Sequence, residues 1–327
     1  MSIITDFPSE DLSSLIEKNS KKLFDSVKGL STGFPDLDRL SRGLLPQHLY
    51  LIGAETGVGK SIFAINILIN LASSNSAKSL YIDLENGPMA TGKRFLMIAG
   101  NKTSQFFDNE DANRPEVSKI TDTFKDKIFY HDRLSLEPQL KGKTSLDEAK
   151  ELGLLIEDYV IKHGVKVVII DPLEEFEIVT NDSTASYTAI QQVVSFFRDL
   201  AQKLSVVIIL IHHLKKPASD SKQVKNFDED IAPKYRIPSI HDFIGSSKIV
   251  NTVTDVWSFV RQIHAPEKEE QGKTLFRILK ARETSLGDIR FQMDIGTLRF
   301  FEISSHPVEQ EVMKTELLST KGIEWEK

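Results

Sequence analysis

The sequence predicts an α/β fold in which helices flank a mostly parallel central sheet that ends in a C-terminal β-hairpin. From residue 30 onward, short apolar strands alternate with helical stretches, a pattern typical of parallel strands joined by helices. The strands at 165–171 and 205–212 are apolar almost throughout, which indicates that both faces of the sheet are covered. The last two strands lie on either side of Gly296 and Thr297, as expected for a hairpin.

The apolar periodicity places each element along the chain. A capping-box spacing of Ser145 and Glu148 marks the start of the third helix, because a Ser hydroxyl and a Glu three residues later satisfy free N–H groups at a helix start. The expected strands are 48–53, 79–84, 128–131, 165–171, 205–212, 256–260, 275–280, 289–293 and 298–302, and the expected helices are 61–72, 89–99, 145–163 and 184–204.

Composition excludes several classes of protein. The 327 residues include no cysteine, so the chain has no disulfide framework, thiolate nucleophile, iron–sulfur cluster or cysteine-bound zinc. Its 41 Lys and Arg against 47 Asp and Glu give a net charge of −6, which argues against coating nucleic acid with the whole surface but allows a local basic channel. No stretch approaches the roughly 20 apolar residues that span a bilayer. We expect a soluble intracellular protein without membrane contact.

The chain divides into three expected parts. Residues 30–303 form the α/β domain, 304–327 a mildly polar tail, and 1–29 a linker or subunit-docking helix. Apolar residues of 11–27 share one helical stripe, so this helix either folds back on its own domain or docks on a neighbouring subunit.

Two irregular stretches, 174–183 and 215–241, follow strand ends directly. Structureless segments of more than about 12–15 residues are usually functional or disordered. Both follow strands whose carboxyl ends face the side where open α/β sheets bind ligands. We therefore expect functional loops there.

The strongest local signal is a phosphate-binding loop at 51–61, between an apolar strand and a helix. Small residues in such a loop let backbone N–H groups surround phosphate oxygens at the helix N-terminus. Lys60 is expected to reach the β- and γ-phosphates, and Ser61 to bind Mg²⁺ through its hydroxyl. The strict motif has Gly where this chain has Ala54, a small departure. The remaining expected nucleotide contacts are Thr56, Gly57, Val58 and Gly59.

Carboxylates at the ends of apolar strands supply the other groups that nucleotide hydrolysis needs. Asp171 ends the strand 165–171 and is the second expected Mg²⁺ ligand. Glu85 follows a neighbouring strand, as in RecA-like ATPases, and is the expected group that activates water, with Asp83 as the alternative. Glu174 and Glu175 are expected to be solvated loop charges.

Six motifs in order resemble those of the DnaB-family hexameric replicative helicases, including the phage and mitochondrial members. They lie at 31–44, 51–61, 83–85, 213–217, 243–255 and 279–282. The resemblance covers roughly residues 30–302 and implies a RecA-like P-loop fold that binds ATP and Mg²⁺. It also implies a ring of subunits, expected to be hexameric, around single-stranded DNA. Many members carry a primase or helical-collar domain before this module, whereas only about thirty residues precede it here, so we expect residues 30–303 to be a stand-alone motor domain.

The resemblance assigns roles to residues outside the phosphate loop. His213 corresponds to a sensor of the γ-phosphate, whereas a metal site on His212 and His213 is disfavoured because adjacent strand residues point to opposite faces. Lys280 and Arg282 match a lysine and arginine that reach the neighbouring subunit's ATP. Arg261 resembles an arginine beside the adenine base. The DNA-binding residues are expected in the longer loop, at Lys215, Lys216, Lys222 and Lys225.

The leading hypothesis is an ATP-hydrolysing helicase that moves along single-stranded DNA at a replication fork. One alternative is a RecA- or RadA-like ATPase that acts in recombination or repair. Another is a nucleotide-switched module that loads or binds partners, which would not need both Glu85 and Arg282. The helicase hypothesis implies a separate primase or loader and a location in bacterial cytoplasm, with a bacterial, phage or plasmid gene.

Overall fold

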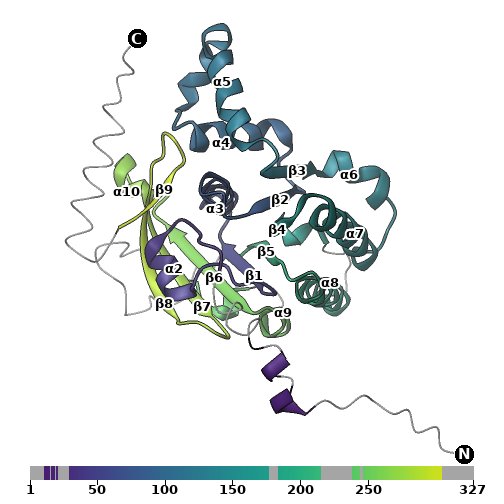
Figure 1. Cartoon of the computed structure of the whole chain (residues 1–327). Helices are drawn as coiled ribbons and strands as arrows, with labels where there is room; N and C mark the ends of the chain where they lie inside the picture. Colours follow the sequence, from purple (N-terminus) through teal and green to yellow (C-terminus); the bar gives the residue numbers. More distant parts are fainter. Residues whose placement is uncertain are drawn as a thin grey trace, which may run out of the picture.

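The central sheet positions the candidate nucleotide-site residues among those that the structure describes. The computed structural model describes residues 11–14, 16–18, 20, 29–176, 183–214, 238–243 and 246–303. In this part of the chain the sheet has nine strands in the order β3-β2-β4-β5-β1-β6-β7-β8-β9 (Figure 1). The strands are β1 Leu49–Ala54, β2 Lys78–Asp83, β3 Ile128–Asp132, β4 Val165–Asp171, β5 Val207–His213, β6 Asp255–Arg261, β7 Lys273–Lys280, β8 Gly287–Met293 and β9 Phe300–Glu302.

The expected α/β architecture is confirmed. Strands β3, β2, β4, β5, β1 and β6 pair in parallel, whereas β7, β8 and β9 extend the sheet through antiparallel pairing. The expected strands differ from the observed ones by one or two residues at most ends, as is usual at element boundaries. Because parallel strands all end at one edge, β1, β2, β4 and β5 deliver their last residues to the same side of the sheet.

The helices cover both faces of the sheet. They are α2 Pro35–Ser41, α3 Lys60–Ser73, α4 Pro88–Ala99, α5 Glu110–Phe124, α6 Arg133–Leu140, α7 Ser145–His163, α8 Ser183–Leu204, α9 Ser246–Thr252 and α10 Lys268–Gly272, with short 3-10 helices η1 Ser104–Asp108, η2 Leu173–Phe176 and η3 Ile240–Asp242. None of the described helices is long and apolar enough to cross a membrane.

Sequence reasoning missed α5, and the reason is its weak apolar pattern. Phe124 is its single buried residue and Pro115 lies inside it, so neither periodicity nor propensity indicates a helix there. Its start is set instead by Asn109, whose side chain accepts a hydrogen bond from the N–H of Ala112 at 3.2 Å.

The cap of α7 lies one residue earlier than expected. Thr144 is the N-cap and accepts a hydrogen bond from the N–H of Asp147 at 3.2 Å. The predicted capping box of Ser145 and Glu148 is therefore wrong, because the hydroxyl of Thr144, one residue earlier, caps the free N–H groups of the helix start. Glu148 pairs instead with Arg133 of α6, at 3.3 Å.

Only part of the expected N-terminal helix falls within the described residues. Residues 12–14, 16–18 and 20 are helical, and 21–27 lie outside the description. Leu12 and Ile16 are 67% and 47% exposed, so these side chains do not pack on their own domain. Docking of this helix on a neighbouring subunit stays a prediction.

Two apolar layers hold the sheet between the helices. Side chains alternate along β1: Tyr50 and Ile52 join the layer under α3, whereas Leu49 and Leu51 join the layer under α7 and α8. Figure 1 shows α3 on one side of the sheet and α7 and α8 on the other. Phe63 of α3 lies at the centre of the first layer and is 1% exposed. Its ring contacts those of Phe34, Phe259, Phe276, Phe291 and Phe300, with centroids 5.3–5.6 Å apart.

Phe63→Ala is expected to lower the free energy of unfolding by about 3–5 kcal/mol, because it removes a buried ring and leaves a cavity among five others. Urea unfolding monitored by circular dichroism measures the loss. Leu154→Ala is the matched control, since Leu154 is 63% exposed and its truncation is expected to change stability by less than about 0.5 kcal/mol. Equal shifts in the two variants would contradict the assignment of Phe63 to the core.

Candidate nucleotide site

The loop between β1 and α3 turns sharply around two glycines. Gly57 and Gly59 have φ angles of 82° and 113°, a region that side-chain-bearing residues rarely adopt. An added Cβ at Gly57 would meet no atom within 4 Å, so the backbone conformation, and not crowding, requires glycine there. Gly59 is the N-cap of α3, which leaves the free N–H groups of the helix start directed into the loop.

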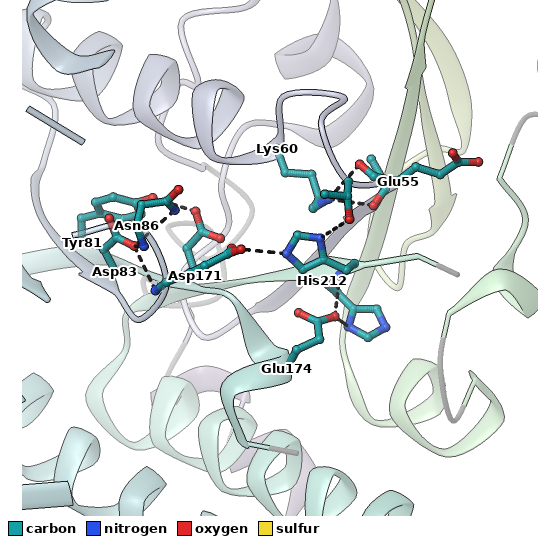
Figure 2. A network of polar contacts seen from close by, with 12 residues as sticks. Glu55, Lys60, Tyr81, Asp83, Asn86, Asp171, Glu174 and His212 are labelled. Carbon is teal, nitrogen blue, oxygen red and sulfur yellow. Dashed lines mark hydrogen bonds and ion pairs between the residues drawn. The ribbon is translucent and has the colours of Figure 1, made fainter. Parts of the chain in front are cut away.

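Lys60 is buried against this loop and is 4% exposed. Its ammonium group donates hydrogen bonds to the carbonyl oxygens of Ala54 at 2.8 Å and Glu55 at 3.0 Å (Figure 2). Burial lowers the pKa of Lys60 to about 8, although the charges of Glu174, Asp171 and other carboxylates oppose this shift. The expected phosphate-binding lysine is thus a desolvated cation at the head of a helix.

Asp171 and Ser61 offer an oxygen pair suited to a divalent cation. Asp171 is fully buried, and its Oδ2 accepts a hydrogen bond from the Tyr81 hydroxyl at 2.7 Å. Among the described residues its Oδ1 has no hydrogen-bond partner. Burial raises the pKa of Asp171, whereas the nearby Ser61 hydroxyl lowers it. A buried free carboxylate oxygen near a hydroxyl fits the hard oxygen ligands of Mg²⁺, and Mg²⁺ binding stays a prediction.

Asp83 holds the loop that carries Glu85. It is fully buried, and Oδ1 accepts a hydrogen bond from the N–H of Asn86 at 2.8 Å (Figure 2). Its Oδ2 accepts hydrogen bonds from the hydroxyls of Thr91 and Tyr130. The alternative of Asp83 as the water-activating group has no support here, because these donors already use both of its oxygens.

A line of three side chains crosses the mouth of the site. His213, at the end of β5, has Nδ1 3.2 Å from the Thr56 hydroxyl and Nε2 3.6 Å from Oε2 of Glu85. Glu85 is half exposed, so its carboxylate is open to water. The structure therefore brings together the expected phosphate loop, phosphate sensor and water-activating carboxylate, whose catalytic roles stay predictions.

Arg261 braces the phosphate loop from β6. Its guanidinium donates hydrogen bonds to the carbonyl oxygens of Val58 at 2.7 Å, Gly57 at 3.1 Å and Gln271 at 3.1 Å. Sequence reasoning missed this bracing role, because the partners are backbone carbonyls that no motif specifies. The expected position beside an adenine base stays a prediction.

Lys280 and Arg282 lie far from the phosphate loop of their own chain. β7 runs antiparallel to β6 and pairs Lys280 with Val256 at the start of β6, whereas Arg261 ends β6 beside the loop. At about 3.3 Å per residue, the five residue steps from Val256 to Arg261 separate them by about 17 Å. The Lys280 ammonium donates to the carbonyl oxygens of Val250 and Val253 at 2.6 Å each.

Glu174 is not the solvated charge that the sequence suggested. Its side chain is 20% exposed, and Oε1 lies 2.5 Å from Nδ1 of His212 (Figure 2). The same oxygen accepts a hydrogen bond from the N–H of His213 at 2.5 Å. Glu174 lies three positions after Asp171, which is the one signal in the sequence that places it near the site.

The four lysines expected to bind DNA, Lys215, Lys216, Lys222 and Lys225, lie outside the described residues.

Comparison with known proteins agrees with this geometry. The family model described as the DnaB-like helicase C-terminal domain matches residues 29–302. This chain belongs to that family. The DnaB-like domain is 23% identical over 302 residues to a probable replicative DNA helicase of Trieres chinensis, which covers 90% of this chain and 62% of the relative. Among the first curated relatives that it matches, the chain spans about three fifths of their length or less.

Solved structures share the fold of the DnaB-like domain. One of them, titled as an ATPase domain, superposes with a TM-score of 0.70 at 18% identity, over 91% of this chain and 100% of that one. A structure titled as a DnaB-like replicative helicase and its interactions with primase superposes with a TM-score of 0.69 at 20% identity, over 91% of this chain and 68% of that one. At these identities the likeness concerns the fold.

The pKa of Lys60 predicts how nucleotide affinity depends on pH. As pH rises through about 8, the nucleotide-free domain loses the ammonium charge that attracts phosphate. The Kd for a fluorescent ATP analogue should therefore rise above pH 8, by up to about tenfold per pH unit. Lys60→Arg is the control, because a guanidinium keeps its charge throughout this range. If Kd changed with pH in the same way for the wild type and Lys60→Arg between pH 7.5 and 9.5, the assignment of Lys60 as the titrating phosphate-binding group would be contradicted.

Proposed function

We propose that this DnaB-like domain hydrolyses Mg·ATP at the interfaces of a ring of subunits and uses the energy to move along single-stranded DNA. In this proposal the ring is a hexamer that separates strands at a replication fork. Membership of the DnaB-like family supports this activity, as do the names of the curated relatives.

One observation carries the proposal that each nucleotide site is formed by two adjacent subunits. The phosphate loop, Asp171 and Glu85 lie at one edge of the sheet, whereas Lys280 and Arg282 lie at the other. Arg261, which contacts the phosphate loop from within the same chain, is engaged with the loop carbonyl oxygens. Lys280 and Arg282 can complete a nucleotide site only in a neighbouring subunit, and in the proposed ring each subunit supplies them to the next.

Each side chain then has a defined task. The loop N–H groups and Lys60 bind the phosphates. Ser61 and Asp171 would hold Mg²⁺, which neutralises phosphate charge when bound. Glu85 accepts hydrogen bonds from the attacking water, and His213 stands between Glu85 and Thr56, where it senses the phosphate that leaves. Arg282 of the adjacent subunit stabilises charge in the transition state.

The net charge of −6 restricts where DNA binds. An acidic protein repels the phosphate backbone over most of its surface, so DNA contacts are confined to a few basic positions. We propose that Lys215, Lys216, Lys222 and Lys225 make these contacts. A separate primase and loader complete the machinery, and the protein acts in the cytoplasm of a bacterial cell.

A forked-DNA unwinding assay with ATP and Mg²⁺ tests the proposed function. Strand separation that requires hydrolysable ATP is the expected result, and Lys60→Ala should abolish both hydrolysis and unwinding because it removes the phosphate-binding cation. Hydrolysis stimulated by single-stranded DNA without unwinding would favour the RecA-like alternative. Nucleotide binding without turnover would favour the switched loader.

Mixed rings test the shared site. Arg282→Ala alone should lower the rate of hydrolysis by at least about a thousandfold while sedimentation shows unchanged oligomers. Mixing Arg282→Ala with Lys60→Ala should restore part of the activity, because some interfaces then combine an intact phosphate loop with an intact arginine. Arg290→Ala is the matched control, since Arg290 is an exposed residue of β8. Full activity of Arg282→Ala on its own would contradict the proposal.

A further inference from the structure

One carboxylate joins the ends of two neighbouring strands at the nucleotide site. Glu174 follows β4 in the short helix η2, and its Oε1 contacts two consecutive residues of β5. It accepts the N–H of His213 at 2.5 Å and lies 2.5 Å from Nδ1 of His212. Because adjacent strand residues point to opposite faces, a single oxygen fixes the buried ring of His212 and the backbone that carries the ring of His213.

The hydrogen bond from the N–H of His213 to Glu174 takes the place of a strand-to-strand hydrogen bond that β4 does not supply. The pairing of β4 with β5 ends at Ile170 and Leu210. On the other side of β5, the N–H of Leu214 donates to the carbonyl oxygen of Ala54 at 3.0 Å. Successive N–H groups of a strand point to opposite neighbours, so the N–H of His213 points toward β4, where the strand has already ended. Glu174 supplies the acceptor that the strand no longer offers.

Glu174 carries its negative charge in this partly buried position. Burial opposes ionisation, but the contacts with His212 and with the N–H of His213 lower the pKa of Glu174 below its ordinary value. Its other oxygen, Oε2, is buried without a hydrogen-bond partner among the described residues. The charge also acts on Lys60, whose pKa it raises more than any other carboxylate does.

The ring of His212 is fixed from its other side as well. It stacks on Phe243, with centroids 5.8 Å apart and planes 17° apart. Phe243 is 1% exposed and fills the space beside Gly53, where a Cβ would collide with its ring. His212 is therefore held between Glu174 and Phe243, and the end of β5 has little freedom to shift.

We propose that Glu174 is a positioning residue, which sets the location of the His213 imidazole between Thr56 and Glu85. This inference rests on the proposed function for its catalytic consequence. His213 lies 3.2 Å from the Thr56 hydroxyl and 3.6 Å from Glu85, so a small displacement of its backbone breaks the line of side chains across the mouth of the site.

Steady-state kinetics of Glu174→Ala test this role. Because misplacement of a catalytic group by about 1 Å costs up to a hundredfold, we expect kcat for DNA-stimulated ATP hydrolysis to fall by about ten- to a hundredfold. We expect this fall in kcat to exceed any rise in KM for ATP, since the phosphate loop is intact and only the Glu174 charge that raises the pKa of Lys60 is lost. Glu174→Gln should keep activity within about threefold of the wild type, because its amide oxygen still accepts the N–H of His213. The exposed neighbour Glu175 supplies the control, Glu175→Ala, with unchanged kinetics.

A double-mutant cycle separates positioning from general stabilisation. In a His213→Ala background, Glu174→Ala should cause no further loss of kcat, because the group that it positions is gone. A further loss as large as in the wild-type background would overturn the proposal. So would wild-type kcat in Glu174→Ala, or a Glu174→Gln variant as impaired as Glu174→Ala.

A spectroscopic readout tests the contact without any hydrolysis. In the full chain labelled with ¹⁵N-histidine, the His213 amide signal is the one lost in His213→Ala, among eight histidines. Glu174→Gln should shift this signal, because the hydrogen bond loses its charge assistance, whereas Glu175→Ala should leave it in place. An unshifted signal in Glu174→Gln overturns the positioning contact. Absence of hydrolysis in the wild type with a shifted signal overturns the proposed function alone.

Discussion

The shared end of the parallel strands is the constraint on which the candidate site depends. Pairing of Ala54 with His213 and of Asp83 with Asp171 brings four strand ends to the same edge of the sheet. Each strand then contributes its next residue or loop to the same small volume. The site therefore depends on the register of the strand pairing. A one-residue slip in β4 or β5 would turn the side chain of Asp171 or His213 to the opposite face of the sheet.

The sequence was sufficient for those features that depend on local pattern. Apolar strands and helices with clear periodicity gave the order of elements, and the glycines with Lys60 and Ser61 identified the phosphate loop. Asp171 and Glu85 could be proposed because each lies at or just after the end of an apolar strand, where a polar side chain has no packing role, whereas His213 was proposed from the resemblance of its motif. α5 was missed because its single buried residue, Phe124, leaves no pattern to detect.

The remaining features depend on contacts between distant segments. Glu174 resembled a loop charge because nothing in its neighbourhood shows that the N–H of His213 lacks a partner. Arg261 resembled a ligand-binding arginine, but three backbone carbonyls engage it. Asp83 and Glu85 are both carboxylates at the end of the same strand, and the sequence does not distinguish their roles. Only the hydrogen-bond donors around Asp83 show that it holds the loop. Hydrogen-bond satisfaction in tertiary structure decides such cases.

The bonds of Lys280 to the carbonyl oxygens at the end of α9 bear on how a ring would communicate. α9 comes after the four lysines expected to bind DNA, with η3 between, and Lys280 donates hydrogen bonds to the carbonyl oxygens of Val250 in its last turn and of Val253 just beyond it. In the proposed ring, a phosphate in the adjacent subunit competes with these carbonyls for the same ammonium group. Nucleotide turnover in one subunit then strengthens or weakens the hydrogen bonds that hold the end of α9 in the next subunit. This coupling requires no direct contact between the two nucleotides.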